Sequence, residues 1–223
     1  MRFTIMSNIY DAADVMSRLG GAGLIPVVVI ENAVDAVPAA KAILTAGLDV
    51  MEITMRTNAG IGALREIRAH CPEMLVGAGT VLSVAKAEEC VEAGAGFIVS
   101  PGFEPSLVDW CAGRGIAVIP GCVTPTEIMM ALSKGINVVK FFPGDVWGGI
   151  KACKSMYAPF ASENLKFIPT GGVNNDNLSE YAGKPFIHAV GGSWLCPAED
   201  ISGRRFDKIT EVVKKAVSIV HSV

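Results

Sequence analysis

The sequence has no long hydrophobic run, no cluster of basic residues and little net charge. No apolar stretch approaches the ~18 residues needed to cross a bilayer, and the N-terminal residues lack the basic-then-apolar layout of a secretory signal. The formal net charge of −3 gives no electrostatic basis for nucleic-acid binding. We therefore expect a cytoplasmic protein that binds neither a membrane nor nucleic acid.

Paired metal-binding and redox motifs are also missing. The histidines, His70, His188 and His221, form no metal-ligand pair, and the cysteines show no C-x-x-C spacing. In a chain of this length without a secretory signal, we expect reduced thiols rather than disulfides. The sequence thus predicts no bound metal and no cofactor. The six scattered cysteines are Cys71, Cys90, Cys111, Cys122, Cys153 and Cys196.

Short apolar runs recur along the whole chain and predict strands. Each run is rich in β-branched or aromatic residues and ends in glycine, proline or threonine. The expected strands are residues 25–30, 49–54, 74–81, 97–101, 117–122, 137–143, 167–172 and 188–193.

Segments with apolar residues three and four apart lie between these runs and predict helices that close with glycine. The expected helices are residues 36–47, 84–95, 105–115 and 124–135, and the expected N-caps are Ser83, Thr124 and Asn174.

This alternation predicts right-handed crossovers and a parallel sheet. We predict an α/β fold in which residues 1–223 form a single (β/α)₈ TIM barrel, with residues 8–20 as an extra N-terminal helix at the bottom. The alternative is a doubly wound open sheet. It is disfavoured because no Gly-rich dinucleotide motif follows the first strand.

The second predicted strand carries polar residues at alternate positions. Glu52, Thr54 and Arg56 share one face, and the other face is apolar, so the polar face is expected to point into the barrel and ascend toward its mouth. Active sites of such barrels lie at the carboxyl ends of the strands. A catalytic carboxylate and a structural Glu–Arg pair are equally compatible with this pattern.

The sixth predicted strand places Lys140 within the apolar sequence VVKFFP. If Phe141 faces the helices, Lys140 points inward, and desolvation of an amine disfavours its charged form. A neutral lysine attacks carbonyl carbons and forms a Schiff base. The alternative is a lysine that extends outward from the strand end, which the flanking apolar residues disfavour.

Two glycine pairs end the last two predicted strands, in PTGGV (169–173) and VGGSW (190–194), and Thr80 ends the third. Backbone N–H groups in such turns, next to a helix N-terminus, commonly hold a phosphate in this type of barrel. Met129 and Met130 have the spacing of helix core, and the tryptophans are expected to pack rather than to bind a cofactor.

With these residues in place, the sequence resembles the 2-keto-3-deoxy-6-phosphogluconate (KDPG)/4-hydroxy-2-oxoglutarate (KHG) aldolases over about residues 22–196. The motifs that carry the resemblance are EITMRT (52–57), VGAGTVL (76–82), FIVSPG (97–102), IPG (119–121), VKFFP (139–143), PTGGV (169–173) and VGGSWL (190–195).

The resemblance implies a class I aldolase that forms a Schiff base and needs no metal. Lys140 matches the Schiff-base lysine and Glu52 the general acid/base. Arg56 and Thr80 match the groups that hold the carboxylate end of the substrate. The implied reaction cleaves KDPG to pyruvate and D-glyceraldehyde 3-phosphate, as in Entner–Doudoroff sugar-acid breakdown, and also cleaves KHG to pyruvate and glyoxylate.

The resemblance also implies a substrate pocket and an assembly. Pro101 and Phe142 match pocket walls, whereas Gly171, Gly172 and Ser193 match the phosphate site. The family is typically a homotrimer of (β/α)₈ barrels, so we expect this chain to form a homotrimer. The small molecule that it binds is expected to be a 2-oxo acid phosphate, its substrate.

Some residues depart from the pattern of the family. Asn58 replaces a common proline, and Gly144, Asp145 and Trp147 lie in PGDVWGG where many members have P-A-E-x-x-G-G. These departures leave the preferred substrate open. The alternatives are an aldolase for the 6-phosphogalactonate epimer or another 2-oxo acid, a phosphosugar isomerase, and a non-catalytic binding barrel.

Overall fold

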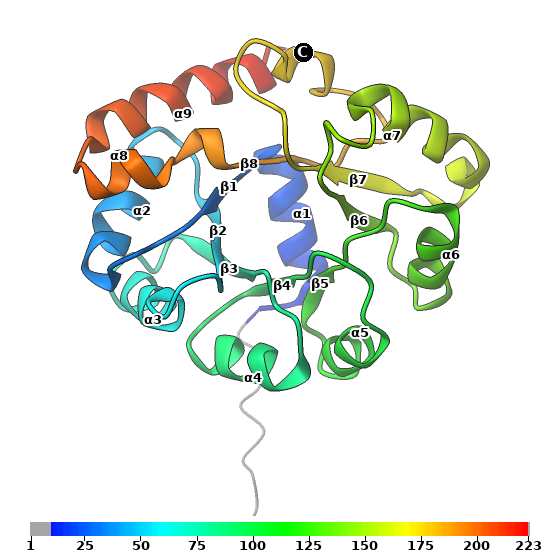
Figure 1. Ribbon diagram of the computed structural model, residues 1–223, viewed down its shortest axis with the longest axis horizontal. Coiled ribbons are helices and arrows are strands. Elements are labelled where there is room, and N and C mark those ends of the chain that lie inside the picture. Colours follow the sequence, from blue (N-terminus) through cyan, green and yellow to red (C-terminus); the bar gives the residue numbers. More distant parts are fainter. Residues whose placement is uncertain (1–9, 223) are drawn as a thin grey trace, which may run out of the picture.

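Residues 10–222 are described in the computed structural model, which Figure 1 shows down its shortest axis. Residues 8 and 9 of the predicted first helix lie outside the described residues. Each predicted strand contains an observed one, apart from small shifts at the ends. The strands are β1 (Leu24–Val28), β2 (Val50–Thr54), β3 (Leu75–Gly79), β4 (Phe97–Val99), β5 (Ala117–Ile119), β6 (Val138–Phe141), β7 (Lys166–Pro169) and β8 (Val190–Gly192).

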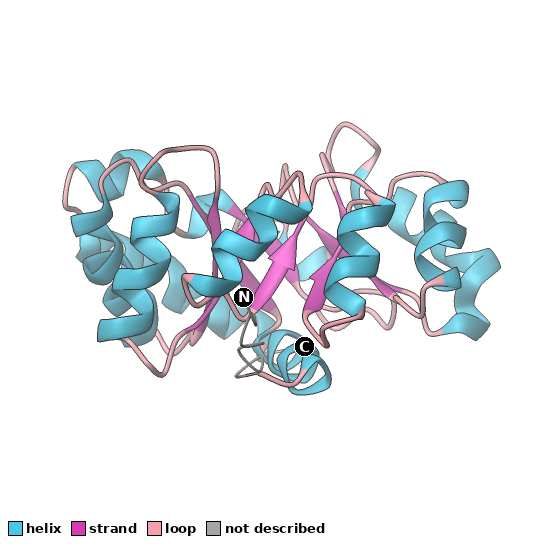
Figure 2. Ribbon diagram, turned by 90° about the horizontal axis from the view of Figure 1, so that it is seen from below, coloured by secondary structure: helices cyan, strands magenta, loops and turns pink. Residues whose placement is uncertain are grey.

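From β1 to β7, an α-helix connects each strand to the next and lies outside the strands (Figures 1 and 2). The α-helices are α1 (Ala12–Ala22), α2 (Ala36–Thr45), α3 (Gly60–His70), α4 (Val84–Glu92), α5 (Pro105–Ala112), α6 (Pro125–Ser133), α7 (Gly149–Tyr157), α8 (Ala198–Ser202) and α9 (Phe206–Val220). The 3₁₀ turns are η1 (Ala33–Asp35), η2 (Ala158–Glu163), η3 (Leu178–Glu180) and η4 (Ser193–Leu195).

The strands are parallel, as the crossover pattern predicts. Six of them form a sheet in the order β5-β4-β3-β2-β1-β8, and β6 pairs with β7. Isolated parallel bridges join Gly121 to Lys140 and Thr170 to Gly191, so β6 lies beside the end of β5 and β7 beside β8. Because neighbouring strands run the same way, their carboxyl ends meet at one end of the fold.

Two of the three predicted N-caps begin helices. The Ser83 hydroxyl accepts a hydrogen bond from the Lys86 N–H at 3.2 Å at the start of α4. Thr124 forms a capping box with Glu127 at the start of α6, in which each side chain accepts from the backbone N–H of the other.

The third predicted N-cap, Asn174, is wrong. Its side-chain oxygen accepts from the Asp176 N–H at 2.8 Å, and the chain forms a turn followed by the short η3. An asparagine that closes a turn onto the second residue after it offers the backbone an alternative to a helix. The segment after β7 therefore has no helix N-terminus at its glycines.

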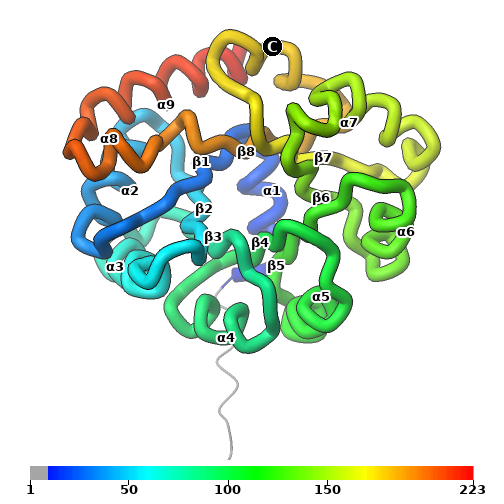
Figure 3. Tube along the Cα trace, viewed as in Figure 1, coloured from blue at the N-terminus to red at the C-terminus, as the bar shows by residue number. Residues whose placement is uncertain are grey.

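Helix α1 lies at the amino ends of the strands. Arg18 donates to Asp49, just before β2, at 2.9 Å, and a ring nitrogen of His188, just before β8, lies 2.9 Å from the Met16 carbonyl oxygen. In the projections of Figures 1 and 3, α1 appears within the ring of strands. This helix covers the end of the fold opposite the strand carboxyl ends.

An apolar cluster lies between strands β6 and β7 and helices α6 and α7. It includes Phe141 and Phe167, whose rings meet edge to face with centroids 5.7 Å apart. Phe141 is fully buried on this helix-facing side, and the neighbouring side chain on the strand must then point the other way. The prediction for the orientation of Lys140 rests on this alternation and is confirmed by its contacts, described below.

The expectation that Met129 and Met130 belong to the helix core is wrong. Met129 is 61% exposed and Met130 38% exposed, whereas Ile128 and Ala131 of the same helix are buried. The error arises because consecutive apolar residues exceed the width of the buried stripe of one helix. No helix in residues 10–222 has the length and apolarity needed to span a membrane.

Candidate active site

A buried lysine and a buried glutamate meet in the interior of the fold, between strands β2 and β6. The Lys140 Nζ lies 3.3 Å from the Glu52 Oε1, and the two side chains are 9% and 4% exposed. Their strands, β6 and β2, are not neighbours in the sheet order, so these side chains meet across the interior. A buried charge of either sign is costly unless it is paired, and each of these groups is the partner of the other.

The backbone fixes the lysine firmly at the junction of two strands. The Lys140 N–H donates to the Pro120 carbonyl at 2.9 Å, and its own carbonyl accepts from the Cys122 N–H at 2.9 Å. The Nζ also lies 5.5 Å from the centre of the Phe142 ring. A primary amine is thus held at a defined depth, beside one carboxylate and one aromatic ring.

Two glycines of β3 leave room for the glutamate and the interior packing. A Cβ added at Gly79 would lie 1.8 Å from the Glu52 Oε1, and one at Gly77 would lie 2.3 Å from the Phe97 ring. Gly77 pairs in register with Glu52, and Gly79 with Thr54. In the motif VGAGT, Gly79 therefore leaves space for the Glu52 carboxylate, and Gly77 leaves space for the Phe97 ring.

Arg56 lies beyond the end of β2 and is exposed, in the turn that follows the strand. Its guanidinium forms no ion pair with the described residues. The structural Glu–Arg alternative is therefore wrong, because Lys140 is the partner of Glu52. The turn itself is anchored by the Thr57 hydroxyl, which donates to the Ile30 carbonyl at 2.5 Å.

Thr80, the first residue after β3, has a backbone φ of +58°. A β-branched residue in the left-handed region is strained by about 1–3 kcal/mol and persists only where its surroundings impose it. Backbone hydrogen bonds hold the residues on both sides of Thr80. The Gly79 carbonyl accepts from the Met55 N–H, and the Val81 N–H donates to the Val99 carbonyl. Strain of this kind clusters at functional sites.

The predicted pocket walls also lie at the carboxyl ends of their strands. Pro101 is exposed after β4, and Phe142 is half-buried after β6. A Cβ at Gly121 would lie 2.1 Å from the Pro101 carbonyl oxygen, so the exits of β4 and β5 pack closely.

The predicted phosphate residues lie at the ends of β7 and β8. Gly171 and Gly172 have φ values of +100° and +75°, which glycine adopts readily, and Ser193 is exposed in η4. Successive backbone N–H groups in turn conformations form concavities that bind anions.

Three contacts around these turns were not predicted from the sequence. A Cβ at Gly172 would lie 2.3 Å from the Cβ of Asp145, so Asp145 packs against the glycine turn. Thr170 is buried beside Gly191, and the Trp194 Nε1–H donates to the Asn175 Oδ1 at 3.1 Å. Only Thr170 carried a sequence signal, because it continues the inward alternation of β7.

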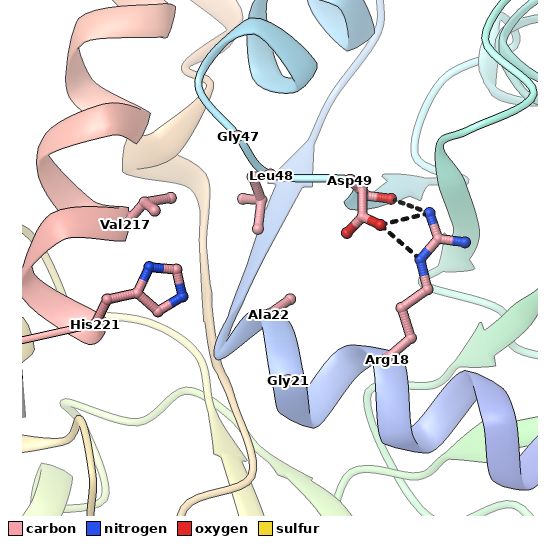
Figure 4. Close-up of a pocket in the computed structure, with 8 residues that line it drawn as sticks. All are labelled: Arg18, Gly21, Ala22, Gly47, Leu48, Asp49, Val217 and His221. Carbon is pink, nitrogen blue, oxygen red and sulfur yellow. Dashed lines mark hydrogen bonds and ion pairs between the residues drawn. The ribbon is translucent and has the colours of Figure 1, made fainter.

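A separate cavity of about 380 Å³ lies near the amino ends of the strands (Figure 4). Arg18 and Asp49 line it as an ion pair, together with the apolar Leu48 and Val217 and the side chain of His221. It contains none of the predicted site residues. Among residues 10–222, no cluster of three or more histidine, cysteine, aspartate or glutamate side chains could hold a metal ion.

A known protein family matches most of this chain. The family model described as KDPG and KHG aldolase matches residues 15–212. A 2-dehydro-3-deoxy-phosphogluconate aldolase from Treponema pallidum (strain Nichols) is 44% identical over 197 residues, which cover 88% of this chain and 93% of the relative.

Solved structures agree as well. A Legionella pneumophila KDPG aldolase, with pyruvate captured as a covalent carbinolamine, aligns with a TM-score of 0.86 and 37% identity over 90% of this chain and 97% of that chain. The 2-keto-3-deoxy-6-phosphogluconate aldolase of Zymomonas mobilis ZM4 with 3-phosphoglycerate aligns with a TM-score of 0.83 and 38% identity over 92% and 95%.

These matches define the class of the protein, a lyase of the Schiff-base type. The chain belongs to the KDPG and KHG aldolase family.

Proposed function

We propose that this chain is a class I aldolase that cleaves KDPG to pyruvate and D-glyceraldehyde 3-phosphate, and that it also cleaves KHG to pyruvate and glyoxylate. The observation that carries the proposal is the 3.3 Å contact between the buried Lys140 Nζ and the Glu52 Oε1. An amine must lose its proton before it attacks a ketone, and a carboxylate at this distance can receive it. The carbinolamine captured in the Legionella pneumophila relative supports the same chemistry.

The reaction begins when the neutral Lys140 amine attacks the C2 ketone to give a carbinolamine. Glu52 transfers protons as the carbinolamine loses water and becomes an iminium. Glu52 then takes the proton of the C4 hydroxyl, the C3–C4 bond breaks, and its electron pair moves into the iminium to give an enamine. The aldehyde leaves, the enamine is protonated at C3, and water hydrolyses the imine to release pyruvate and Lys140. The iminium is the electron sink, so this sequence needs no metal or cofactor.

The remaining predicted residues bind the two ends of the substrate. Arg56 supplies a bidentate cation for the carboxylate, and the strained Thr80 supplies a hydroxyl beside it. Phe142 and Pro101 form the pocket walls. This assignment is supported by their common position at the carboxyl ends of the strands.

The phosphate is assigned to the turns after β7 and β8, through Gly171, Gly172 and Ser193. The positive φ values of the glycines support an anion-binding turn. The relative with 3-phosphoglycerate supports a phosphorylated ligand.

We further propose that residues 1–223 form one domain whose eight strands close into a (β/α)₈ barrel, with α1 as the extra helix. The parallel bridges from Gly121 to Lys140 and from Thr170 to Gly191 support closure. A homotrimer is also proposed, and the exposed apolar side chains of Met129 and Met130 offer surface for subunit contact. A cytoplasmic location is supported by six unpaired cysteines, which suit a reducing compartment.

The test is reductive trapping. Wild-type protein with pyruvate and borohydride is expected to gain one pyruvate-derived mass, which peptide mapping locates at Lys140. Lys140→Ala should lose the adduct, whereas Lys151→Ala, at an exposed lysine of α7, should keep it. Persistent labelling of Lys140→Ala would assign the Schiff base to another lysine. No adduct in the wild type would favour an isomerase or a binding barrel.

A second set of measurements tests the acid/base role of Glu52 and the substrate preference. Glu52→Gln should still form the adduct slowly but lose about 10²–10⁴-fold in kcat. The ratio of kcat/KM for KDPG, its C4 epimer from galactonate and KHG then decides which 2-oxo acid is preferred.

A further inference from the structure

The exits of β7 and β8 are linked by one side-chain hydrogen bond. The Trp194 Nε1–H in η4 donates to the Asn175 Oδ1, in the turn after β7, at 3.1 Å. The Nδ2 of Asn175 donates in turn to the Val212 carbonyl of α9 at 3.4 Å. Both side chains are half-buried. The bond joins two loops whose strands are also linked by the bridge between Thr170 and Gly191.

The indole ring also occupies the position of a missing side chain. A Cβ built on Gly192 would lie 1.6 Å from Cζ3 of Trp194. The ring therefore lies directly on the backbone of the last residue of β8, one residue before Ser193. Trp194 thus restricts both the path of this turn and, through Asn175, its distance from the turn after β7.

The turn after β7 has its own internal supports. The Asn177 Nδ2 donates to the Gly172 carbonyl at 2.9 Å, and the Asn177 Oδ1 accepts from the Asn174 N–H at 2.9 Å. Only the short 3₁₀ turn η3 follows these glycines before β8, so asparagine side chains take the place of α-helical hydrogen bonds in fixing the turn. The Trp194–Asn175 bond connects this supported turn to the neighbouring one.

We infer that Trp194 and Asn175 are positioning residues that hold the two glycine turns together as one phosphate site, and so set the preference for phosphorylated substrates. This inference rests on the proposed function. A phosphate held by backbone N–H groups from both turns needs them at a fixed separation. A substrate without a phosphate places no group there and should not respond to that separation.

The experiment compares Trp194→Phe, Asn175→Ala and the double variant with two substrates. Each single variant is expected to raise KM for KDPG about fivefold, the factor that corresponds to a hydrogen bond worth about 1 kcal/mol. The double variant should be about as impaired as one single variant, because both changes remove the same bond. KM for KHG and both kcat values should stay within about twofold. Inorganic phosphate, used as a competitive inhibitor of KHG cleavage, should weaken by the same factor as KDPG.

A matched control is Trp110→Phe in α5, where the indole packs under Arg114, and it should leave both KM values unchanged. An equal rise of KM for the two substrates, or no rise for KDPG, would overturn the inference. Adduct formation with pyruvate and borohydride is measured on every variant. Absence of the adduct in the wild type rejects the proposed function itself, whereas a normal adduct with equal KM effects rejects only the role of Trp194 and Asn175.

Discussion

Replacement of Gly79 by alanine tests whether the space beside Glu52 is required for catalysis. The new Cβ would lie 1.8 Å from Oε1, 2.5 Å from Cδ and 2.7 Å from Cγ of Glu52. An ordinary contact begins near 3.4 Å. Backbone hydrogen bonds hold β3 between β2 and β4, so the glutamate side chain is the part that must move.

The required displacement decides the size of the effect. The carboxylate has to retreat by more than about 1.5 Å, which separates it from the Lys140 Nζ, now 3.3 Å away. A misplacement of about 1 Å can cost on the order of 10²-fold in rate. We therefore expect Gly79→Ala to lower kcat by at least about 10²-fold, approaching the loss in Glu52→Gln.

The assay is pyruvate release from KDPG coupled to lactate dehydrogenase, with the borohydride adduct measured in parallel. The adduct with pyruvate should persist, since Lys140 is untouched. The matched control is Gly21→Ala in α1, where a Cβ would meet no atom within 4 Å and kcat should be unchanged. A kcat for Gly79→Ala within about threefold of wild type, in a folded protein, would refute a catalytic role for the position of this carboxylate.

Other predictions concern stability and reactivity. Gly77→Ala places its Cβ 2.3 Å from the buried Phe97 ring and should lower the free energy of unfolding by about 1–3 kcal/mol, measured by urea unfolding. A second change, Phe97→Leu, should recover part of this loss because it removes the clash. Burial lowers the pKa of His188 below its ordinary 6.5, so the unfolded chain binds more protons below that pH. Thermal stability should therefore fall as pH is lowered from about 8 to about 5.5, and His188→Gln should flatten this dependence; an unchanged slope would exclude His188 as its source. A thiol reagent at about pH 8 should label the native protein slowly and the urea-unfolded protein at once, and rapid native labelling would contradict the burial. Burial raises the pKa to about 12 for the thiols of Cys90, Cys111, Cys122, Cys153 and Cys196.

Features that depend on neighbours along the chain were predictable. Alternation within VVKFFP gave the inward direction of Lys140, because successive side chains of a strand point to opposite faces. Ser83 and Thr124 were recognisable as N-caps because their hydrogen bonds reach only three residues ahead. The same reasoning gave a wrong N-cap at Asn174, because an asparagine side chain can close a turn as well as cap a helix.

The sequence by itself determined the strand positions, the parallel α/β alternation and the types of residue available for a Schiff base. Only the tertiary structure decided which groups meet. Glu52 and Lys140 are 88 residues apart and contact each other because β2 and β6 face a common interior. Likewise Asn175 finds Trp194 across two strand exits, and Arg56 lies exposed rather than paired. Such contacts follow from the packing of distant segments, which no local periodicity encodes.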